Sequence, residues 1–459
     1  MTRTRSIAFF LTTVVASFGS ARAHAAGPLA PQGQPITTSG YAVDLFQGPV
    51  LASGRITGLA GAYAPLAQGA EGMNFNAAAP AVRNPWSHDK VDWDVTAGVT
   101  FPSSVSGTDF DNNGTKGFAY DNFVFLTGGG QIQYGPWGVG VTLNLQQYDL
   151  DKSEKAAAIP NLRLRLLTGH VLTAYSFLDD QLVMGAGVRG AVLGVLQSNA
   201  TDGTSGTNEK ELLTMVGVGP ELGIVWAPKN LPTRFGITTR APVRGSAQAT
   251  SRTKPDAAGD TRINALYLPN EIELPAELET GVAFQIGPRP INLGWHDVHS
   301  VPKAEIDAER RIVKGQREND DTVAWRILRR SYWKLPQSRF LITMSVLLSG
   351  KTRQAVGFES FLSQTVDRSG LTVSASPRVG LEAEAIPSRL RARGGSYLEP
   401  TRFTGSSARI HGTAGFDVKV LKWRVFNLFE DEETAFHIGG VVDIAREYFG
   451  WGISAGIWR

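Results

Sequence analysis

Five residues near the C-terminus have the spacing of a hydrolase nucleophile motif. Residues 452–456, GISAG, match the pattern GxSxG, in which a strand, a sharp turn and a following helix expose the serine. Here the motif lies in an alternating stretch typical of a strand, and only three residues follow Gly456. We therefore expect no catalysis at Ser454, and an outer-membrane esterase or phospholipase is an alternative that this match alone motivates.

A second candidate for chemistry is a cation-binding loop. Residues 109–114, DFDNNG, place oxygen-bearing side chains at alternate positions and a glycine at the turn, as in the first half of a calcium loop. The twelfth position, where such a loop has a bidentate glutamate, is Tyr120. Asp109, Asp111 and Asn113 are thus a weak calcium candidate, and the sequence favours a polar loop rich in turn formers.

The composition excludes several other classes of site. The chain has 459 residues, no cysteine, seven histidines and a formal net charge of +3. Without cysteine there is no disulfide scaffold and no thiolate metal site, and the histidines show no metal-ligand spacing. The weak charge balance does not favour nucleic acid as a partner. We therefore expect no cofactor, no metal beyond the weak calcium candidate and no nucleic acid.

Residues 1–26 have the features of a bacterial secretory signal peptide. Arg3 and Arg5 precede an apolar run from Ile7 to about Phe18, and small-residue cleavage sites follow at 21–25. Beyond this segment there is no apolar run of roughly eighteen residues, so helical membrane spans are excluded. A β-barrel is not excluded, because its strands alternate in polarity.

The remaining chain repeats segments in which apolar and polar or small residues alternate. In the first, Val91, Trp93 and Val95 share one face while Asp92 and Asp94 share the other, and similar segments recur at 137–146, 234–241, 340–348 and 409–420. Strands of about ten residues with aromatic ends fit a tilted crossing of a bilayer. The sequence predicts an all-β fold, a transmembrane antiparallel up-and-down β-barrel of about 14 strands. A literal count gives about sixteen, and closure requires an even number.

The connections between these segments alternate in length, as they do in outer-membrane barrels with short periplasmic turns and long outer loops. Long connections are expected at 102–120, 151–160, 198–211, 250–274, 300–336, 366–376 and 399–407. Short connections are expected at 135–136, 179–180, 228–231, 287–290, 350–351 and 387–388, and the alternation weakens after residue 424. The charged segment 301–335 is therefore expected in a solvated outer loop. A weaker hypothesis is that lipopolysaccharide phosphates bind there to Arg311, Arg317, Arg329 or Arg330.

One predicted hairpin, residues 379–397, carries charges on a single face. With the turn at Pro387 and Ser388, Glu384 falls opposite Arg391 and Glu382 opposite Arg393, which pairs opposite charges across strands. In a bilayer these charges can only point into a polar lumen. The expected lumenal charge ladder comprises Glu382, Glu384, Arg389, Arg391 and Arg393.

The stretch that follows the signal peptide resembles part of a known family. Residues 58–63, GLAGAY, and 74–78, NFNAA, together with 172–176, 222–228 and 235–243, resemble motifs of the FadL family of outer-membrane transporters for long-chain fatty acids and other hydrophobic compounds. One departure is Ala77, where the family pattern has proline; Pro80 lies close by. The resemblance implies an N-terminal plug in the lumen, with Asn76 as its anchor. The plug residues are Gly58, Gly61, Tyr63, Asn74, Phe75 and Asn76.

The resemblance also implies a domain plan and a function. Residues 27–88 would form an N-terminal extension and plug, and residues 89–459 the barrel. A monomer in the bacterial outer membrane, in contact with lipid and lipopolysaccharide, would take up a hydrophobic small molecule passively and release it through the wall. The hypothetical lateral opening is at glycines that could bend strands: Gly128, Gly129, Gly130, Gly138 and Gly140. The alternative is a structural or surface-interaction barrel without transport.

Overall fold

A computed structural model of the chain describes fourteen stretches of it with short gaps between them. They are residues 28–83, 91–102, 108–116, 120–150, 162–198, 209–229, 231–247, 259–263, 266–292, 299, 301–312, 319–335, 339–423 and 434–458. The expected signal peptide, residues 1–26, lies outside these residues, as do His24, His88 and His296.

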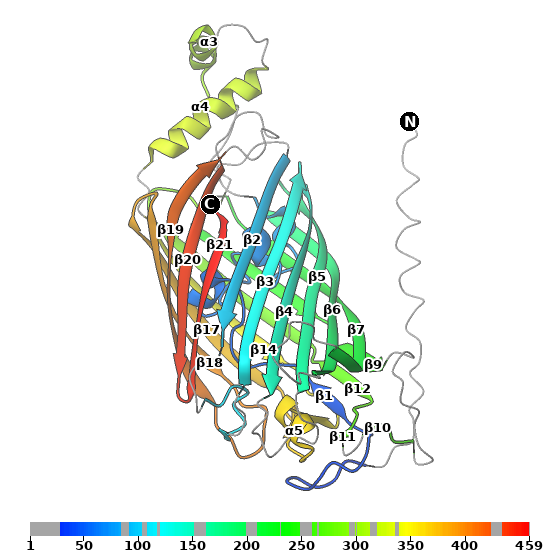
Figure 1. The fold of residues 1–459 in the computed structure, drawn as a ribbon. Helices are drawn as coiled ribbons and strands as arrows, with labels where there is room; N and C mark the ends of the chain where they lie inside the picture. Colours follow the sequence, from blue (N-terminus) through cyan, green and yellow to red (C-terminus); the bar gives the residue numbers. More distant parts are fainter. Residues whose placement is uncertain are drawn as a thin grey trace, which may run out of the picture.

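The chain forms a closed antiparallel barrel of 14 strands (Figure 1). The wall closes where the last strand pairs with the first, with Ala97 opposite Ala455. The wall strands follow the order of the chain. They are β2 (Val91–Phe101), β3 (Tyr120–Tyr134), β4 (Trp137–Leu150), β5 (Leu162–Phe177), β6 (Leu182–Ser198), β7 (Glu209–Trp226), β8 (Thr233–Arg240) continued by β9 (Val243–Ala247), β12 (Glu271–Leu274) continued by β13 (Glu277–Ile286), β14 (Phe340–Ser349), β17 (Ser374–Ile386), β18 (Leu390–Glu399), β19 (Arg409–Trp423), β20 (Thr434–Ala445) and β21 (Tyr448–Ile457).

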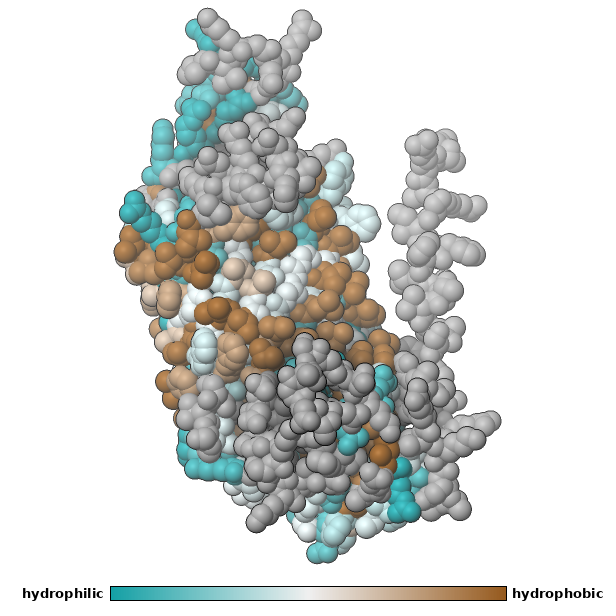
Figure 2. All heavy atoms as spheres, viewed as in Figure 1, coloured by the Kyte–Doolittle hydropathy of each residue, from teal (hydrophilic) through white to brown (hydrophobic). Residues whose placement is uncertain are grey.

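The alternation of the sequence sorts residues between the two faces of this wall. On β4, Val139, Val141 and Leu143 are exposed on the outside, whereas Thr142 and Asn144 are buried inside. Apolar side chains cover much of the outer face of the barrel in Figure 2. Because soluble proteins rarely expose so large an apolar surface, this outer face fits a lipid environment.

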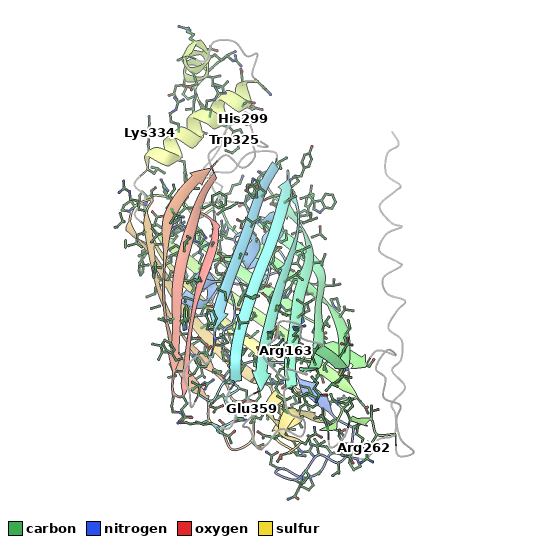
Figure 3. All side chains as sticks on the ribbon, viewed as in Figure 1. Arg163, Arg262, His299, Trp325, Lys334 and Glu359 are labelled. Atoms are coloured by element: carbon green, nitrogen blue, oxygen red, sulfur yellow. The ribbon has the colours of Figure 1, made fainter. Side chains whose placement is uncertain are left out.

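The two ends of the barrel carry different connections. We call the end with the turns at 135–136, 178–181, 227–232 and 387–389 the turn end, and the opposite end the loop end. The loop end carries α5 and four short strands, and the turn end carries α3 and α4 (Figures 1 and 3). At the loop end are β10 (Arg262–Ile263), β11 (Leu266–Tyr267), β15 (Ala355–Val356), α5 (Phe358–Ser363) and β16 (Arg368–Ser369), and at the turn end α3 (Lys303–Ile312) and α4 (Asp320–Lys334).

Two expectations from the connections are wrong. Strand β13 pairs directly with β14, and β14 with β17, so the crossings implied between 290 and 300 and between 351 and 366 are not in the wall. Residues 358–363 form a buried helix instead. A strand that crosses the wall takes the chain to the opposite end of the barrel. The extra crossing expected between 290 and 300 therefore places the charged segment 301–335 at the end with the long loops. Instead it lies at the turn end, as His299, Trp325 and Lys334 show in Figure 3.

The N-terminal part of the chain enters the barrel from the loop end. There β1 (Ala42–Asp44) pairs in parallel with β12 and β15. Residues 53–83, the lumenal segment, then run through the lumen with three short helices, α1 (Gly54–Gly58), α2 (Gly69–Gly72) and η2 (Ala79–Ala81). Among the described residues, no helix is both long and apolar enough to cross a membrane, a finding that does not bear on strands.

Candidate ligand-binding lumen

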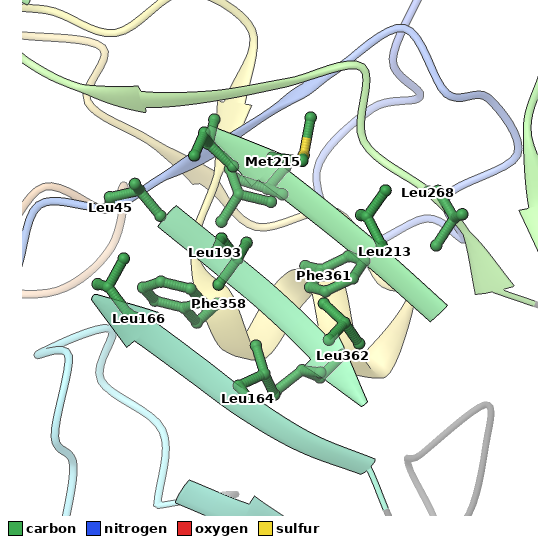
Figure 4. Close-up of a cluster of buried hydrophobic side chains, with 14 of the residues drawn as sticks. Leu45, Leu164, Leu166, Leu193, Leu213, Met215, Leu268, Phe358, Phe361 and Leu362 are labelled. Carbon is green, nitrogen blue, oxygen red and sulfur yellow. The ribbon is translucent and has the colours of Figure 1, made fainter. Parts of the chain in front are cut away.

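The lumen near the loop end is lined by an apolar cluster. Inward side chains of β5, β6 and β7 pack against α5 and the N-terminal stretch (Figure 4). Leu164, Leu193 and Met215 come from the three strands, and Phe361 and Leu362 come from the helix, each at most 1% exposed. Near the loop end, the inward residues of β5, β6 and β7 are therefore apolar, whereas the inward residues of β4 are small or polar.

Between this cluster and the lumenal segment lies a cavity of about 200 Å³. Its lining combines apolar side chains with polar and charged ones. Its apolar lining includes Leu45, Phe46, Val50, Leu51, Phe75, Phe125, Leu166, Leu274 and Leu347, and its polar lining includes Gln47, Asn74, Asn144, Gln146, Thr168, His170, Arg189, Arg240, Glu277, Glu279 and Arg378. A typical small-molecule site is mostly apolar with a few polar groups, and this cavity is more polar than that because several charged side chains line it.

The charged groups that line this cavity are paired with one another. Arg189 and Arg240 both contact Glu277, with N to O distances of 2.9 and 3.1 Å. Arg378 lies 3.6 Å from Glu279. His170 lies 2.8 Å from Glu221, which is buried behind it. The positive and negative side chains around the cavity therefore neutralise one another. Buried charges are costly unless they are paired with an opposite charge in this way.

The lumenal segment is bonded to strands on all sides of the wall. Asn76 is fully buried; its side-chain amide donates to the carbonyls of Ala64 at 2.9 Å and Ile224 at 3.2 Å, and its Oδ1 accepts from the backbone N–H of Ala78. One side chain thus ties two turns of the segment to β7. The six residues predicted for the plug all belong to this segment, with Gly58, Gly61, Tyr63 and Asn76 buried and Asn74 and Phe75 partly buried.

Inward glycines of the wall provide the space that the segment occupies. A Cβ at Gly138 would lie 1.9 Å from the carbonyl oxygen of Pro80, and one at Gly140 would lie 2.3 Å from the sulfur of Met73. The same holds for Gly185 against Ala77, Gly223 against Asn76 and Gly236 against Ala64. These glycines therefore permit close approach of another backbone.

The glycines predicted for a lateral opening divide into two groups. Gly138 and Gly140 face the lumenal segment, as described above. Gly128, Gly129 and Gly130 lie in an unbroken ladder that pairs residues 125–134 with β2 and residues 124–134 with β4. No bulge or interruption occurs at these three positions.

The strand ladder changes register elsewhere, at three prolines, although β6 and β7 stay paired through Pro220 and the backbone N–H of Ala241 donates to the carbonyl of Pro220 at 2.9 Å. Pro220 in β7, Pro242 between β8 and β9, and Pro275 between β12 and β13 lie where the registers of neighbouring strands break. Proline has no backbone N–H and is confined to edges and breaks of sheets. The guanidinium of Arg189 spans this break and donates to the carbonyls of Ala241 at 3.0 Å and Pro275 at 2.6 Å.

A buried ion-pair network fixes the lumenal segment to the hairpin predicted to carry charges. Strands β17 and β18 pair Glu382 with Arg393 and Glu384 with Arg391, which is the register that the sequence predicts. Arg55 of the lumenal segment donates to Glu382 at 3.0 and 3.2 Å and to the hydroxyl of Tyr63 at 2.8 Å. Arg389 does not join the network; it lies exposed beside the turn.

The two sequence candidates for chemistry lie in settings that differ from those of the motifs they match. Ser454 lies inside β21, without the turn and helix of a nucleophile elbow. The carboxylate of Asp109 accepts from the backbone of Asn113 at 3.1 Å and Gly114 at 2.9 Å, so it closes the loop on itself. Within the described ranges, no three histidine, aspartate or glutamate side chains are placed to hold a metal ion.

Sequence reasoning missed most of the residues around the cavity. These residues come from strands that are far apart in the chain. The alternation of the sequence predicts that their side chains point inward, but it does not predict which of them lie around one cavity. The three prolines were a readable signal, because proline inside an alternating segment marks an edge or a break in a sheet.

Comparisons with known proteins give similarities of fold. No family model matches the chain, and no curated protein is similar to it at a significant level. A FadL homologue of Pseudomonas aeruginosa is 11% identical with a TM-score of 0.48, and 91% of this chain and 99% of that chain are covered.

Two further structures are similar in the same way. The toluene transporter TbuX of Ralstonia pickettii is 12% identical with a TM-score of 0.44, covering 88% of this chain and 96% of that one. The toluene transporter TodX of P. putida is 10% identical with a TM-score of 0.47, covering 88% of this chain and 97% of that one. These likenesses are too distant to carry a conclusion on ligand or activity.

Proposed function

We propose that the protein is a bacterial outer-membrane channel for passive uptake of hydrophobic small molecules. The observation that carries the proposal is the cavity of about 200 Å³ between the loop-end apolar cluster and the lumenal segment. A barrel that served only as a structural element would have no need of a cavity of this size with apolar side chains in its lining. Long-chain fatty acids are one class of compound that such a channel would admit.

The orientation follows from the connections. Outer-membrane barrels place short turns in the periplasm and long loops outside, so the loop end would face the exterior and the turn end the periplasm. The hydrophobic compound would then enter beside the apolar cluster and meet the lumenal segment as a plug. In this orientation α3 and α4 face away from lipopolysaccharide, and Arg330 is paired with Glu309 at 2.6 Å.

The exit we propose is the wall break at Pro220, Pro242 and Pro275. The cavity lies next to it, because Arg189, Gly190 and Leu274 line the cavity and flank the break. Between β7 and the β8–β9 junction the described backbone pairing is reduced to one hydrogen bond, from Ala241 to Pro220, and the side chain of Arg189 adds two more contacts. The change of register at these prolines is a physical reason to place the exit here. Gly128 to Gly130 offer no such reason, because their strand pairing is continuous.

The test is to fill the cavity without changing the rest of the barrel. Thr168 on β5 lines the cavity, and Thr173 on the same strand is exposed on the outer face. Thr168→Trp is expected to lower uptake of radiolabelled oleate and toluene roughly tenfold, because the indole replaces the space for the ligand. Thr173→Trp is the matched control and is expected to leave uptake unchanged.

The readout is uptake by cells that lack their own hydrophobic-compound transporters, with the amount of folded barrel measured by its heat-modifiable migration. Equal uptake by Thr168→Trp and the wild type would contradict a route through the cavity. Uptake by the wild-type protein no higher than by cells without it would favour the structural barrel instead.

A further inference from the structure

A second, smaller cavity lies at the loop end beside the first. Its volume is about 20 Å³, which is enough for one group the size of a water molecule. The N-terminal stretch, the loop 108–116, β3, α5 and Phe403 enclose it. Its lining is Phe46, Phe110, Phe123, Phe358 and Phe403 with Asp44, Gln47, Asp111, Gly357 and Ser369.

Two carboxylates line this small cavity, and their surroundings differ. Asp44 is neutralised by Arg402, whose Nε donates to Asp44 Oδ2 at 2.8 Å, and it also accepts from Ser369 at 2.8 Å. Both carboxylate oxygens of Asp111 are buried and, within the described part of the chain, accept no hydrogen bond of normal geometry. A buried carboxylate without a partner is costly, so this position calls for a group that the chain itself does not provide.

The groups nearest to Asp111 make its charge less favourable. Burial raises the pKa of Asp111 well above its usual value, and the neighbouring carboxylates Glu359, Asp109 and Asp367 raise it further. The backbone N–H of Asn113, which donates to Asp109 at 3.1 Å, lowers it by a smaller amount. A bound cation would reverse both increases, because it supplies the missing opposite charge. In the larger cavity, by contrast, the lining arginines are already paired with glutamates.

The chemistry of the lining distinguishes between kinds of cation. A metal ion would need several oxygen ligands, and the described residues offer no set of three carboxylate or histidine side chains for one. Aromatic faces instead attract organic ammonium groups. The volume admits an ammonium head of about the size of water and excludes a trimethylated one.

We propose that Asp111 and the surrounding phenylalanines bind the primary ammonium group of a hydrophobic amine. Phe46 and Gln47 line both cavities, so an alkyl chain attached to the ammonium group would reach the larger cavity by displacing these two side chains. The proposal rests on the proposed uptake function and names a class of compound for it. A carboxylate head group would find the described lining arginines of the larger cavity already paired with glutamates, so it would gain less from its charge than an ammonium group gains at Asp111.

The test compares three probes of one chain length, n-hexylamine, 1-hexanol and hexanoate. Isothermal titration calorimetry of the full-length protein in detergent micelles at neutral pH gives their affinities. The amine is expected to bind roughly tenfold or more tightly than the alcohol, because a charge-assisted contact replaces an unpaired carboxylate. Asp111→Asn is expected to remove this advantage and to leave the affinity for hexanol unchanged.

Two further variants separate the head-group site from general effects. Phe403→Leu keeps the apolar contact and removes an aromatic face, so it is expected to weaken amine binding about threefold and not hexanol binding. Asp179→Asn is the matched control, because Asp179 lies at the turn end, its side chain is 87% exposed and it does not line the cavity. It is expected to change amine affinity by less than about twofold.

Several outcomes would overturn the proposal. Equal affinity for amine and alcohol, or an equal loss of both in Asp111→Asn, would remove the ammonium site and leave the proposed uptake function standing. One-to-one displacement of hexylamine by millimolar calcium chloride would assign the site to an inorganic cation. If none of the three probes binds, the uptake function fails together with the ammonium site.

Discussion

The two halves of the lumen are built differently. In the turn half, the lumenal segment is fitted against wall glycines and held by buried ion pairs such as Arg55 with Glu382. In the loop half, apolar side chains of the wall face a cavity of about 200 Å³. In the turn half, hydrogen bonds and ion pairs fix the lumenal segment in one position, and the segment fills the space. In the loop half, the apolar side chains make no directional contacts, and space for a ligand remains. The barrier and the ligand site are therefore separate parts of one lumen.

The fit in the turn half can be broken most severely at its glycines. Gly138→Val and Gly185→Val place a side chain where the carbonyl oxygens of Pro80 and Ala77 lie, 1.9 and 2.0 Å from the new Cβ. Neither the backbone of the segment nor the wall can absorb such an overlap, so we expect a loss of about 3 kcal/mol or more and displacement of the segment. Ion conductance through single channels in planar bilayers should rise.

A glycine on the neighbouring strand gives the control for this change. Gly128→Val adds the same side chain where the nearest atom, the carbonyl oxygen of Thr96, is 3.9 Å from the new Cβ. It should leave conductance at the wild-type level. Equal conductance of Gly138→Val and Gly128→Val would show that close packing does not hold the segment.

The ion pairs of the turn half are the next largest contribution. Arg55→Met leaves the buried carboxylate of Glu382 without one of its cations and should cost about 3 kcal/mol. Hydrogen exchange of residues 53–83 in the folded barrel should accelerate accordingly. Arg244→Met removes a pair whose arginine is 51% exposed, and there we expect less than about 1 kcal/mol. Similar rates of hydrogen exchange in Arg55→Met and Arg244→Met would show that the buried ion pair of Arg55 does not hold the lumenal segment in place.

The smallest effect is expected in the loop half, at Asp111. Because the folded pKa of this carboxyl is raised above its unfolded value, the folded state binds the proton more tightly. Stability from this group is present at low pH and is lost as pH rises through the interval between the two pKa values. Asp111→Asn should therefore stabilise the barrel at neutral pH by about 1 kcal/mol.

This stability difference can be followed by urea unfolding as a function of pH. The wild type and Asp111→Asn should converge in stability below the unfolded pKa and diverge as pH rises. A variant less stable than the wild type at neutral pH would show that Asp111 has a stabilising partner in the free protein.

Local patterns in the sequence predicted the parts of the fold that depend on neighbouring residues. The register of Glu382 with Arg393 follows from one turn and from the period of two residues in a strand. The wall strands follow from the same period. The sequence motif around Asn76 likewise coincides with a residue that joins distant backbone groups.

Features that depend on distant parts of the chain could not be read in this way. The helix at 358–363 and the non-strand residues near 291 are apolar enough to resemble strands, and they shifted the predicted side of α3 and α4. Arg189 and Pro275 are 86 residues apart, so their contact at the wall break follows only from closure of the barrel.

The most direct test of the separation of barrier and ligand site is to locate a bound probe. Crystals soaked in 1-iodohexane would reveal the iodine by its anomalous scattering. We predict a peak in the loop half, between Phe75, Leu166 and Leu347, with the lumenal segment in place beside it. Iodine found only within the turn half, or no ordered iodine in the lumen, would contradict the account.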